Sequence, residues 1–125
     1  MKFLLYLSLL SLFVASCTRA GEGGSAILTV NVFVDTTGNL CTDCEVYIYY
    51  GDSSYQSTNK YSYDDEGITN IYGQYSFSRL RRGEYSIYAL GIDPLFGDTV
   101  SGRIGESIED SETERHLTIN AKKIE

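Results

Sequence analysis

The chain has no Trp, one His and one Pro among its 125 residues. The lone His116 excludes catalytic schemes and metal sites that need two imidazoles. The shortage of Pro leaves Gly, which occurs 12 times, to form the tight turns. Tyr, in contrast, occurs 11 times, and its ring suits pleated, half-buried surfaces. This composition favours an all-β domain.

Positive charge is also scarce, because 10 Lys and Arg face 17 Asp and Glu. The net charge of −7 becomes −8 once a leader containing Lys2 is removed. Nucleic acids and anionic lipid surfaces attract basic patches, so no nucleic-acid partner is expected. The length allows one domain with a core of useful size.

The N-terminal segment MKFLLYLSLLSLFVASC has a positive Lys2 followed by an apolar run from Phe3 to Val14. This is the signal-peptide pattern, and the run is shorter than the roughly 20 residues that span a bilayer. Val14-Ala15-Ser16-Cys17 resembles the bacterial lipobox. In that class of signals the Cys is lipidated and becomes the first mature residue. The alternative is an ordinary secretory leader with a free Cys17.

The lipobox resemblance implies a signal peptide over residues 1–16 and membrane attachment through Cys17. Thr18 rather than Asp after the Cys favours the outer membrane of a Gram-negative cell envelope. Residues 17–25 are polar and Gly-rich, which predicts a flexible tether. A domain is expected over residues 26–122.

Alternating apolar residues predict short strands along this domain, and the first of these segments is ILTVNVFVD. The expected strands are Ile27–Asp35, Val46–Tyr50, Lys60–Tyr63, two within Ile68–Ile92, Thr99–Ile104 and Leu117–Ala121. Three polar segments are expected to be a loop (51–59), a strand break (64–67) and an acidic loop (107–114). Strands at this spacing indicate a sandwich.

Residues 69–89, TNIYGQYSFSRLRRGEYSIYA, resemble the transthyretin-like β-sandwiches, which include carboxypeptidase regulatory-like modules. The matching positions are Thr69, Gly73, Tyr75, Phe77, Leu80, Gly83 and Tyr85, with Asn70 where Asp is usual. The resemblance implies an antiparallel sandwich of about seven strands. The alternation itself predicts that Tyr75 and Phe77 enter the core.

Cys41 and Cys44 form a C-x-x-C that has three possible roles: a redox centre, part of a metal site or a disulfide. A redox pair needs a helix N-terminus, yet the β-prone EVYIYY follows. Zinc needs about four ligands. If Cys17 carries lipid, two thiols remain in an oxidising compartment, which favours a structural disulfide. A thiol- or metal-handling protein stays open as the second hypothesis.

Acidic turns at Asp64–Gly67 and between Asp93 and Asp98 offer oxygen ligands, but they lack the spacing of a calcium loop. We therefore expect no metal site and no cofactor. Asp35-Thr36-Thr37 and Asp98-Thr99-Val100 resemble an O-glycosylation sequon of exported proteins, which would modify Thr36 and Thr99.

Five tyrosines are predicted to point away from the core: Tyr47, Tyr49, Tyr61, Tyr63 and Tyr88. Tyr rings offer rigid contact area with a hydroxyl, which suits a glycan or protein ligand. Cross-strand pairing on the sheet is the alternative. No nucleophile–base pair is evident in the sequence. The first hypothesis is therefore a lipid-anchored, non-enzymatic envelope module that binds a surface protein or glycan.

Overall fold

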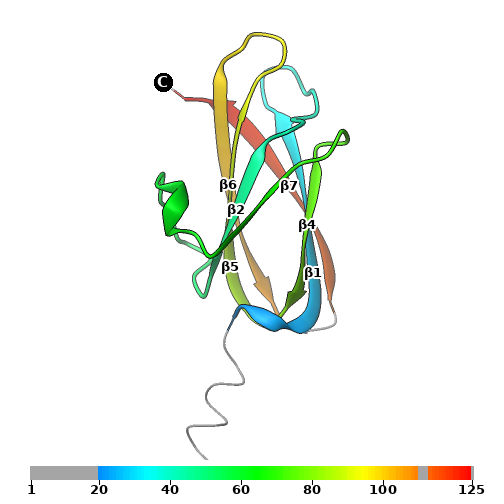
Figure 1. Ribbon diagram of the computed structural model, residues 1–125, viewed down its shortest axis with the longest axis vertical. Helices are drawn as coiled ribbons and strands as arrows, with labels where there is room; N and C mark the ends of the chain where they lie inside the picture. Colours follow the sequence, from blue (N-terminus) through cyan, green and yellow to red (C-terminus); the bar gives the residue numbers. More distant parts are fainter. Residues whose placement is uncertain (1–19, 110–112, 125) are drawn as a thin grey trace, which may run out of the picture.

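The computed structural model describes residues 20–109 and 113–124, which form seven strands and one 3₁₀ turn. The strands are β1 (Glu22–Val34), β2 (Glu45–Tyr50), β3 (Asp65–Ile68), β4 (Gln74–Leu80), β5 (Gly83–Ile92), β6 (Thr99–Ile108) and β7 (Glu114–Lys123), and the 3₁₀ turn is η1 (Lys60–Ser62). They hydrogen-bond in the order β3-β2-β5-β6-β7-β1-β4 (Figure 1). The expectation of an all-β domain with about seven strands is confirmed.

The sheet is mixed, so the prediction of a purely antiparallel sandwich is wrong. β1 and β7 run parallel from the pair Ile27–Glu114 to the pair Val34–Ala121, while every other neighbouring pair is antiparallel. β6 and β7 are joined only through Val100–Lys123 and Ser101–Lys122. The sheet therefore folds over at this short junction and nearly closes into a barrel.

The remaining opening of the barrel lies between the two edge strands, β3 and β4. The Tyr75 ring of β4 lies directly against the Gly67 backbone of β3, in the space that a Cβ on Gly67 would occupy. A side chain rather than a hydrogen-bond ladder therefore closes this seam. Tyr75 is accordingly half-buried and packs against the edge of the core, whereas Phe77 is buried within it.

The core follows the alternation that the sequence predicts. Leu28, Val30, Val32 and Val34 of β1 are buried, as are Val46 and Ile48 of β2. The other large contributors are Phe77, Leu80, Tyr85, Ile87, Val100, Ile108, Leu117 and Ile119. Successive strand residues point to opposite faces, so this period places one apolar row per strand inside the barrel.

Two predictions around residues 60–68 are wrong. Residues 60–62 form η1 rather than a strand, because the Asn59 side chain caps the turn by accepting from the Tyr61 N–H at 3.1 Å. The predicted break at 64–67 is instead largely β3. Its backbone pairs with β2, and the carboxylates of Asp65 and Glu66 stay exposed because β3 is an edge strand.

The predicted tether and acidic loop are both shorter than expected. β1 begins at Glu22, and Gly21 before it is fixed by its carbonyl, which accepts from the Arg81 N–H at 2.7 Å. β6 continues to Ile108, which is 1% exposed, so only residues 109–113 connect β6 to β7. The predicted leader and Cys17 lie outside the described residues. Within residues 20–109 and 113–124, no helix is long and apolar enough to cross a bilayer.

Candidate functional site

The strand directions give the barrel two different ends (Figure 1). We call the end where β1 begins the proximal end. The distal end comprises three loops, at residues 35–44, 69–73 and 93–98, together with Ile124 after β7. Because neighbouring strands other than β1 and β7 are antiparallel, these loops, far apart in sequence, meet at one end of the molecule.

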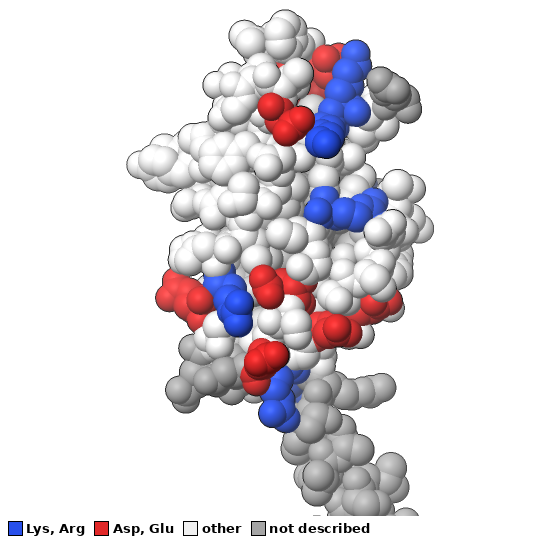
Figure 2. Space-filling model, turned by 180° about the vertical axis from the view of Figure 1, so that it is seen from behind, with Lys and Arg blue, Asp and Glu red and all other residues white. Residues whose placement is uncertain are grey.

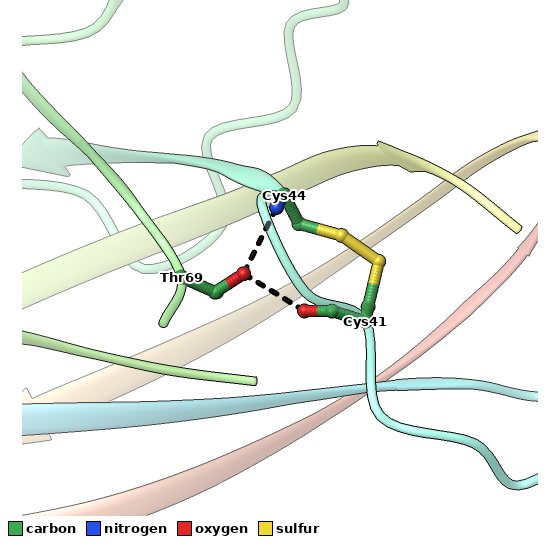
Figure 3. Close-up of a disulfide and its surroundings, with 3 residues drawn as sticks. All are labelled: Cys41, Cys44 and Thr69. Carbon is green, nitrogen blue, oxygen red and sulfur yellow. Dashed lines mark hydrogen bonds between the residues drawn. A yellow bond between two sulfur atoms is a disulfide. The ribbon is translucent and has the colours of Figure 1, made fainter. Parts of the chain in front are cut away.

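A buried disulfide between Cys41 and Cys44 lies at the distal end, so the disulfide prediction is confirmed. The two Cα atoms are 5.9 Å apart, and both residues are fully buried. Thr69 lies between them, as Figure 3 shows: its hydroxyl accepts from the Cys44 N–H at 2.9 Å and donates to the Cys41 carbonyl at 2.8 Å. Thr69 therefore fastens the C-x-x-C loop.

Further contacts make the distal loops one unit. The Thr69 N–H donates to the Cys44 carbonyl at 2.9 Å, and the Asp43 N–H donates to the Thr69 carbonyl at 3.2 Å. On β5, the Gly91 backbone lies against both sulfur atoms and leaves no room for a Cβ. The 35–44 loop, the 69–73 loop and the end of β5 are thereby held rigidly together.

The 93–98 loop is closed by Asp93, which is 2% exposed. The Asp93 N–H donates to the Asp98 carbonyl at 2.8 Å, and the Asp93 carboxylate accepts from the Leu95 N–H at 2.8 Å. The Asp93 carboxylate, a possible calcium ligand in the sequence, therefore stabilises the turn through this hydrogen bond. No group of three or more His, Cys, Asp or Glu able to hold a metal ion occurs among the described residues.

Exposed apolar side chains gather at the distal end. Of the nine large hydrophobic residues exposed in the described ranges, eight lie here: Leu40, Ile68, Ile71, Tyr72, Ile92, Leu95, Phe96 and Ile124. Their exposed fractions run from 39% at Leu40 to 73% at Ile71. Charged side chains are also present close to this end on the rear face, and Lys123 lies 3.7 Å from the Asp98 carboxylate (Figure 2). The sequence signal was present, as Ile71-Tyr72 and Leu95-Phe96 are apolar pairs inside turns, but our sequence analysis missed it.

The predicted tyrosine surface is a covered layer rather than an open one. Tyr47 and Tyr88 are 2% and 3% exposed, and Tyr49 and Tyr63 are half-buried, so these rings do not form the open ligand surface that the sequence predicts. The cause is the 51–64 segment, which folds back over the outer face of β2 and β5. Only Tyr61, at 86% exposure, is open to solvent.

Ring stacking holds this cover in place. Tyr55, which our sequence analysis missed, stacks on Tyr49 with centroids 3.7 Å apart, and Tyr63 stacks on Tyr88 at 5.7 Å. The Ser86 hydroxyl donates to the Tyr55 carbonyl at 2.7 Å, and the Tyr63 hydroxyl donates to the Ser57 carbonyl at 2.8 Å. The alternative of tyrosine pairing on the sheet therefore describes this face better than an open ligand surface does.

The environment of these rings keeps them neutral. Burial, together with the carboxylates of Glu45 and Glu66, raises the pKa of Tyr47 far above its ordinary value. Burial, reinforced by Asp65, Glu22 and Asp64, raises the pKa of Tyr50 to about 12. The hydroxyls of Tyr47 and Tyr50 therefore remain protonated and uncharged well above physiological pH.

The other predicted residues take simple positions. Thr36 and Thr99 are both exposed, Thr36 in the 35–44 loop and Thr99 at the start of β6. His116 is exposed on β7, with Nε2 3.7 Å from the Glu114 carboxylate.

No protein-family model matches the chain, and no curated protein matches it. Solved structures similar to the chain include the following two. One is an aspartate-to-alanine variant of BcpA, the major pilin subunit of Bacillus cereus, with a TM-score of 0.56 and 16% identity; the match covers 80% of this chain and 30% of the pilin. The other is a Pseudomonas aeruginosa protein provisionally described as carbohydrate-binding, with a TM-score of 0.46, 16% identity and coverage of 79% of this chain and 91% of the other.

At this identity the likeness to the pilin concerns the fold alone, and this chain spans about 30% of the pilin's length. Together with the seven-stranded mixed sheet it places the chain among β-sandwich domains, in a nearly barrel-shaped form. A fold of this kind hosts many functions, so the function has to be argued from the surface of this molecule.

Proposed function

We propose that this protein is a lipid-anchored, non-enzymatic module of the cell envelope that docks its distal end on a partner protein. One observation carries the proposal: β1 starts at the proximal end, whereas eight exposed apolar side chains lie at the distal end. A membrane anchor joined to the first end directs the second away from the bilayer.

The anchor would be short. The Gly21 N–H donates to the Tyr85 hydroxyl at 3.0 Å, so the chain is already held at residue 21. Cys17 precedes Ala20 by three residues, which span at most about 11 Å when fully extended. The domain therefore stands close to the membrane, in contrast to a domain on the nine-residue tether first expected. The outer membrane of a Gram-negative cell is the proposed location.

The chemistry of the distal end favours a protein over a glycan as its occupant. Exposed Ile, Leu, Phe and Tyr gain free energy mainly by burial of apolar area, whereas sugars need convergent hydrogen-bonding groups. The disulfide and Thr69 fix the loops beforehand, which lowers the entropy lost on binding. Aromatic anchors such as Tyr72 and Phe96 are typical of the centres of protein interfaces.

We assign the sandwich to the transthyretin-like class. This assignment is supported by the structural roles of residues in the matching segment. Thr69 hydrogen-bonds to the disulfide loop, Phe77 and Leu80 are buried, and the Tyr85 hydroxyl accepts from the Gly21 N–H. The thiol-handling alternative is not favoured, because Cys41 and Cys44 are both oxidised and fully buried. Modification of the exposed Thr36 and Thr99 remains a prediction.

Anchoring is tested by metabolic labelling of the full chain with palmitate. The label and the partition into detergent should both disappear in Cys17→Ala, with Cys41→Ala as the matched cysteine control that keeps them. Unchanged labelling of Cys17→Ala would contradict the anchor.

Docking is tested by a photo-crosslinking amino acid at Phe96, at Tyr72 or, as the control, at Arg82 on the proximal side. The proposal expects one and the same protein partner from positions 96 and 72 and none from position 82. Leu95→Ser should reduce the crosslinked product severalfold. Crosslinks from position 82 alone, or none from the distal positions in intact cells, would overturn the docking site while leaving the anchor untouched.

A further inference from the structure

A pocket of about 280 Å³ opens between η1 and β3, apart from the distal end. Three rings line it, from Tyr47, Tyr61 and Tyr63, with Lys60 and the consecutive carboxylates of residues 64–66. Tyr61 and Lys60 come from η1 and Glu66 from β3. These are the two segments that the sequence misassigned, so the pocket could not be anticipated from the strand pattern.

The charge in this pocket is unbalanced. The Lys60 ammonium lies 3.4 Å from a carboxylate oxygen of Glu45, which is outside the lining, and 5.6 Å from the Tyr61 ring centroid. Its charge is therefore matched by Glu45. No salt bridge to Asp64, Asp65 or Glu66 occurs among the described residues. Three carboxylates remain without a cation.

A buried hydroxyl adds an independent observation. Tyr47 is 2% exposed, and its oxygen has no hydrogen-bond partner. Tyr47 is paired across the sheet with Glu66 of β3, so their side chains share the outer face. Tyr47 lines the pocket, and burial, then the Glu45 carboxylate and then the Glu66 carboxylate raise the pKa of its hydroxyl. Leaving a buried hydroxyl unpaired costs roughly 1–3 kcal/mol unless a ligand or water satisfies it.

The unsatisfied atoms cluster on one row of the sheet. Glu66, Tyr47, Tyr88 and Arg103 are directly paired across β3, β2, β5 and β6. Tyr47 Oη and Arg103 Nη1 are the two buried side-chain polar atoms without a partner in the described part of the chain. Arg103 lies further along the row, and its guanidinium carbon is 5.1 Å from the Tyr88 ring centroid. Arg103 is therefore the positively charged residue at that end of the row. The cation that lines the pocket, Lys60, is paired with Glu45, which lies outside the lining.

We propose that this pocket binds an alkylammonium group. An ammonium carries one positive charge and three N–H donors, which match the three carboxylates that no cation neutralises. The exposed Tyr61 ring attracts cations through its quadrupole, as the Lys60 ammonium 5.6 Å from its centroid illustrates. The same carboxylates repel phosphate, sulfate and acidic sugars. The group comes either from a Lys side chain of a protein or from a free polyamine.

The test uses the full chain in non-ionic detergent with ¹³C-labelled tyrosine rings, titrated with n-butylammonium and observed by NMR. The Tyr61 and Tyr63 signals should shift saturably. n-Butanol, the neutral analogue, and butyrate should bind at least about fivefold more weakly, because the attraction is electrostatic. Equal binding of butanol, or no saturable shift of either ring, would overturn the proposal.

Variants locate the site. Glu66→Gln should raise the Kd for butylammonium about fivefold, and Tyr61→Ala, followed through the Tyr63 signal, about two- to fivefold. Glu109→Gln and Tyr72→Ala are the matched controls at exposed positions elsewhere and should leave the Kd unchanged. Glu66→Gln without effect would overturn the assignment even if the other variants weaken binding.

Two further titrations distinguish the sources. Tighter binding of putrescine than of N-acetyl-lysine methylamide supports a polyamine, the reverse supports a Lys side chain, and binding of neither overturns the proposal. The pocket lies outside the distal end, so the two proposals are tested separately. Absence of ammonium binding would not contradict docking at the distal end, and absence of distal crosslinks would not contradict ammonium binding in the pocket.

Discussion

Thr69 is the residue on which the distal end depends most directly. It is 2% exposed, and its hydroxyl hydrogen-bonds to Cys41 and Cys44 of the disulfide loop. Its backbone makes two further hydrogen bonds to the same loop, with Cys44 and with Asp43. A hydroxyl donates one hydrogen bond and accepts others, so a single Thr can satisfy both a carbonyl and an N–H. This explains why a Thr, rather than an apolar β-branched residue, fits a buried site beside two sulfur atoms.

Thr69→Val should lower the free energy of unfolding by about 1–3 kcal/mol, because the Cys44 N–H and Cys41 carbonyl are left unpaired in the interior. Urea denaturation measures the change. Thr69→Ser keeps the hydroxyl and should recover most of the loss. If Val and Ser behave alike, the hydroxyl is not the stabilising group.

Tyr50 predicts an alkaline limit to stability. In the unfolded chain its hydroxyl ionises near pH 10, whereas burial raises the pKa in the folded protein to about 12. Above pH 10 the folded state holds the proton more firmly than the unfolded state does, so stability falls as the pH rises from about 10 to about 12. Thermal unfolding in Tyr50→Phe should show a shallower decline than in wild type, with Tyr72→Phe as the exposed control. Parallel declines would contradict this.

Among the elements, β3 differs most from the sequence expectation. Its Asp and Glu read as a strand break, yet an edge strand pairs on one side and leaves its charges in water. Gly67 within β3 then admits the Tyr75 ring across the opening of the barrel. A short acidic strand therefore both completes the sheet and receives the side chain that closes it.

Gly67→Ala should destabilise the fold by about 1–3 kcal/mol, because the new methyl group overlaps the Tyr75 ring. In a Tyr75→Ala background the same change should cost less, since the ring is gone. A double-mutant cycle by chemical denaturation gives the coupling. Additive effects would mean that Tyr75 does not close the seam.

At the scale of the whole molecule, one end holds the chain entry and the other the apolar loops. β5 connects the two ends through 10 residues, which correspond to about 33 Å at strand rise. The difference between the ends is one of exposed apolar area, because eight of the nine exposed large hydrophobic residues in the described ranges lie at the distal end. The proposed module, anchored at the proximal end and facing a partner with the distal end, would need this arrangement.

The proposed anchor at the proximal end predicts an orientation of the barrel on the membrane. A fluorophore at Arg82 on the proximal end should be quenched strongly by quenchers placed in the lipid headgroups of reconstituted vesicles. A fluorophore at Phe96 should be quenched weakly, since about 33 Å separates the ends. Equal quenching at both positions would mean that the barrel lies flat on the membrane.

The sequence by itself determined the strands of the core, the apolar rows of β1, β2 and β5, and the pairing of Cys41 with Cys44. These depend on period-two alternation and on short-range proximity, which a linear pattern contains. Only the tertiary structure decided that β1 and β7 run parallel, that the 51–64 segment covers three tyrosines of β2 and β5, and that Ile71, Leu95 and Phe96 meet at one end. Each of these depends on contacts between residues distant in the chain, whose geometry is fixed by how the strands are ordered in the sheet.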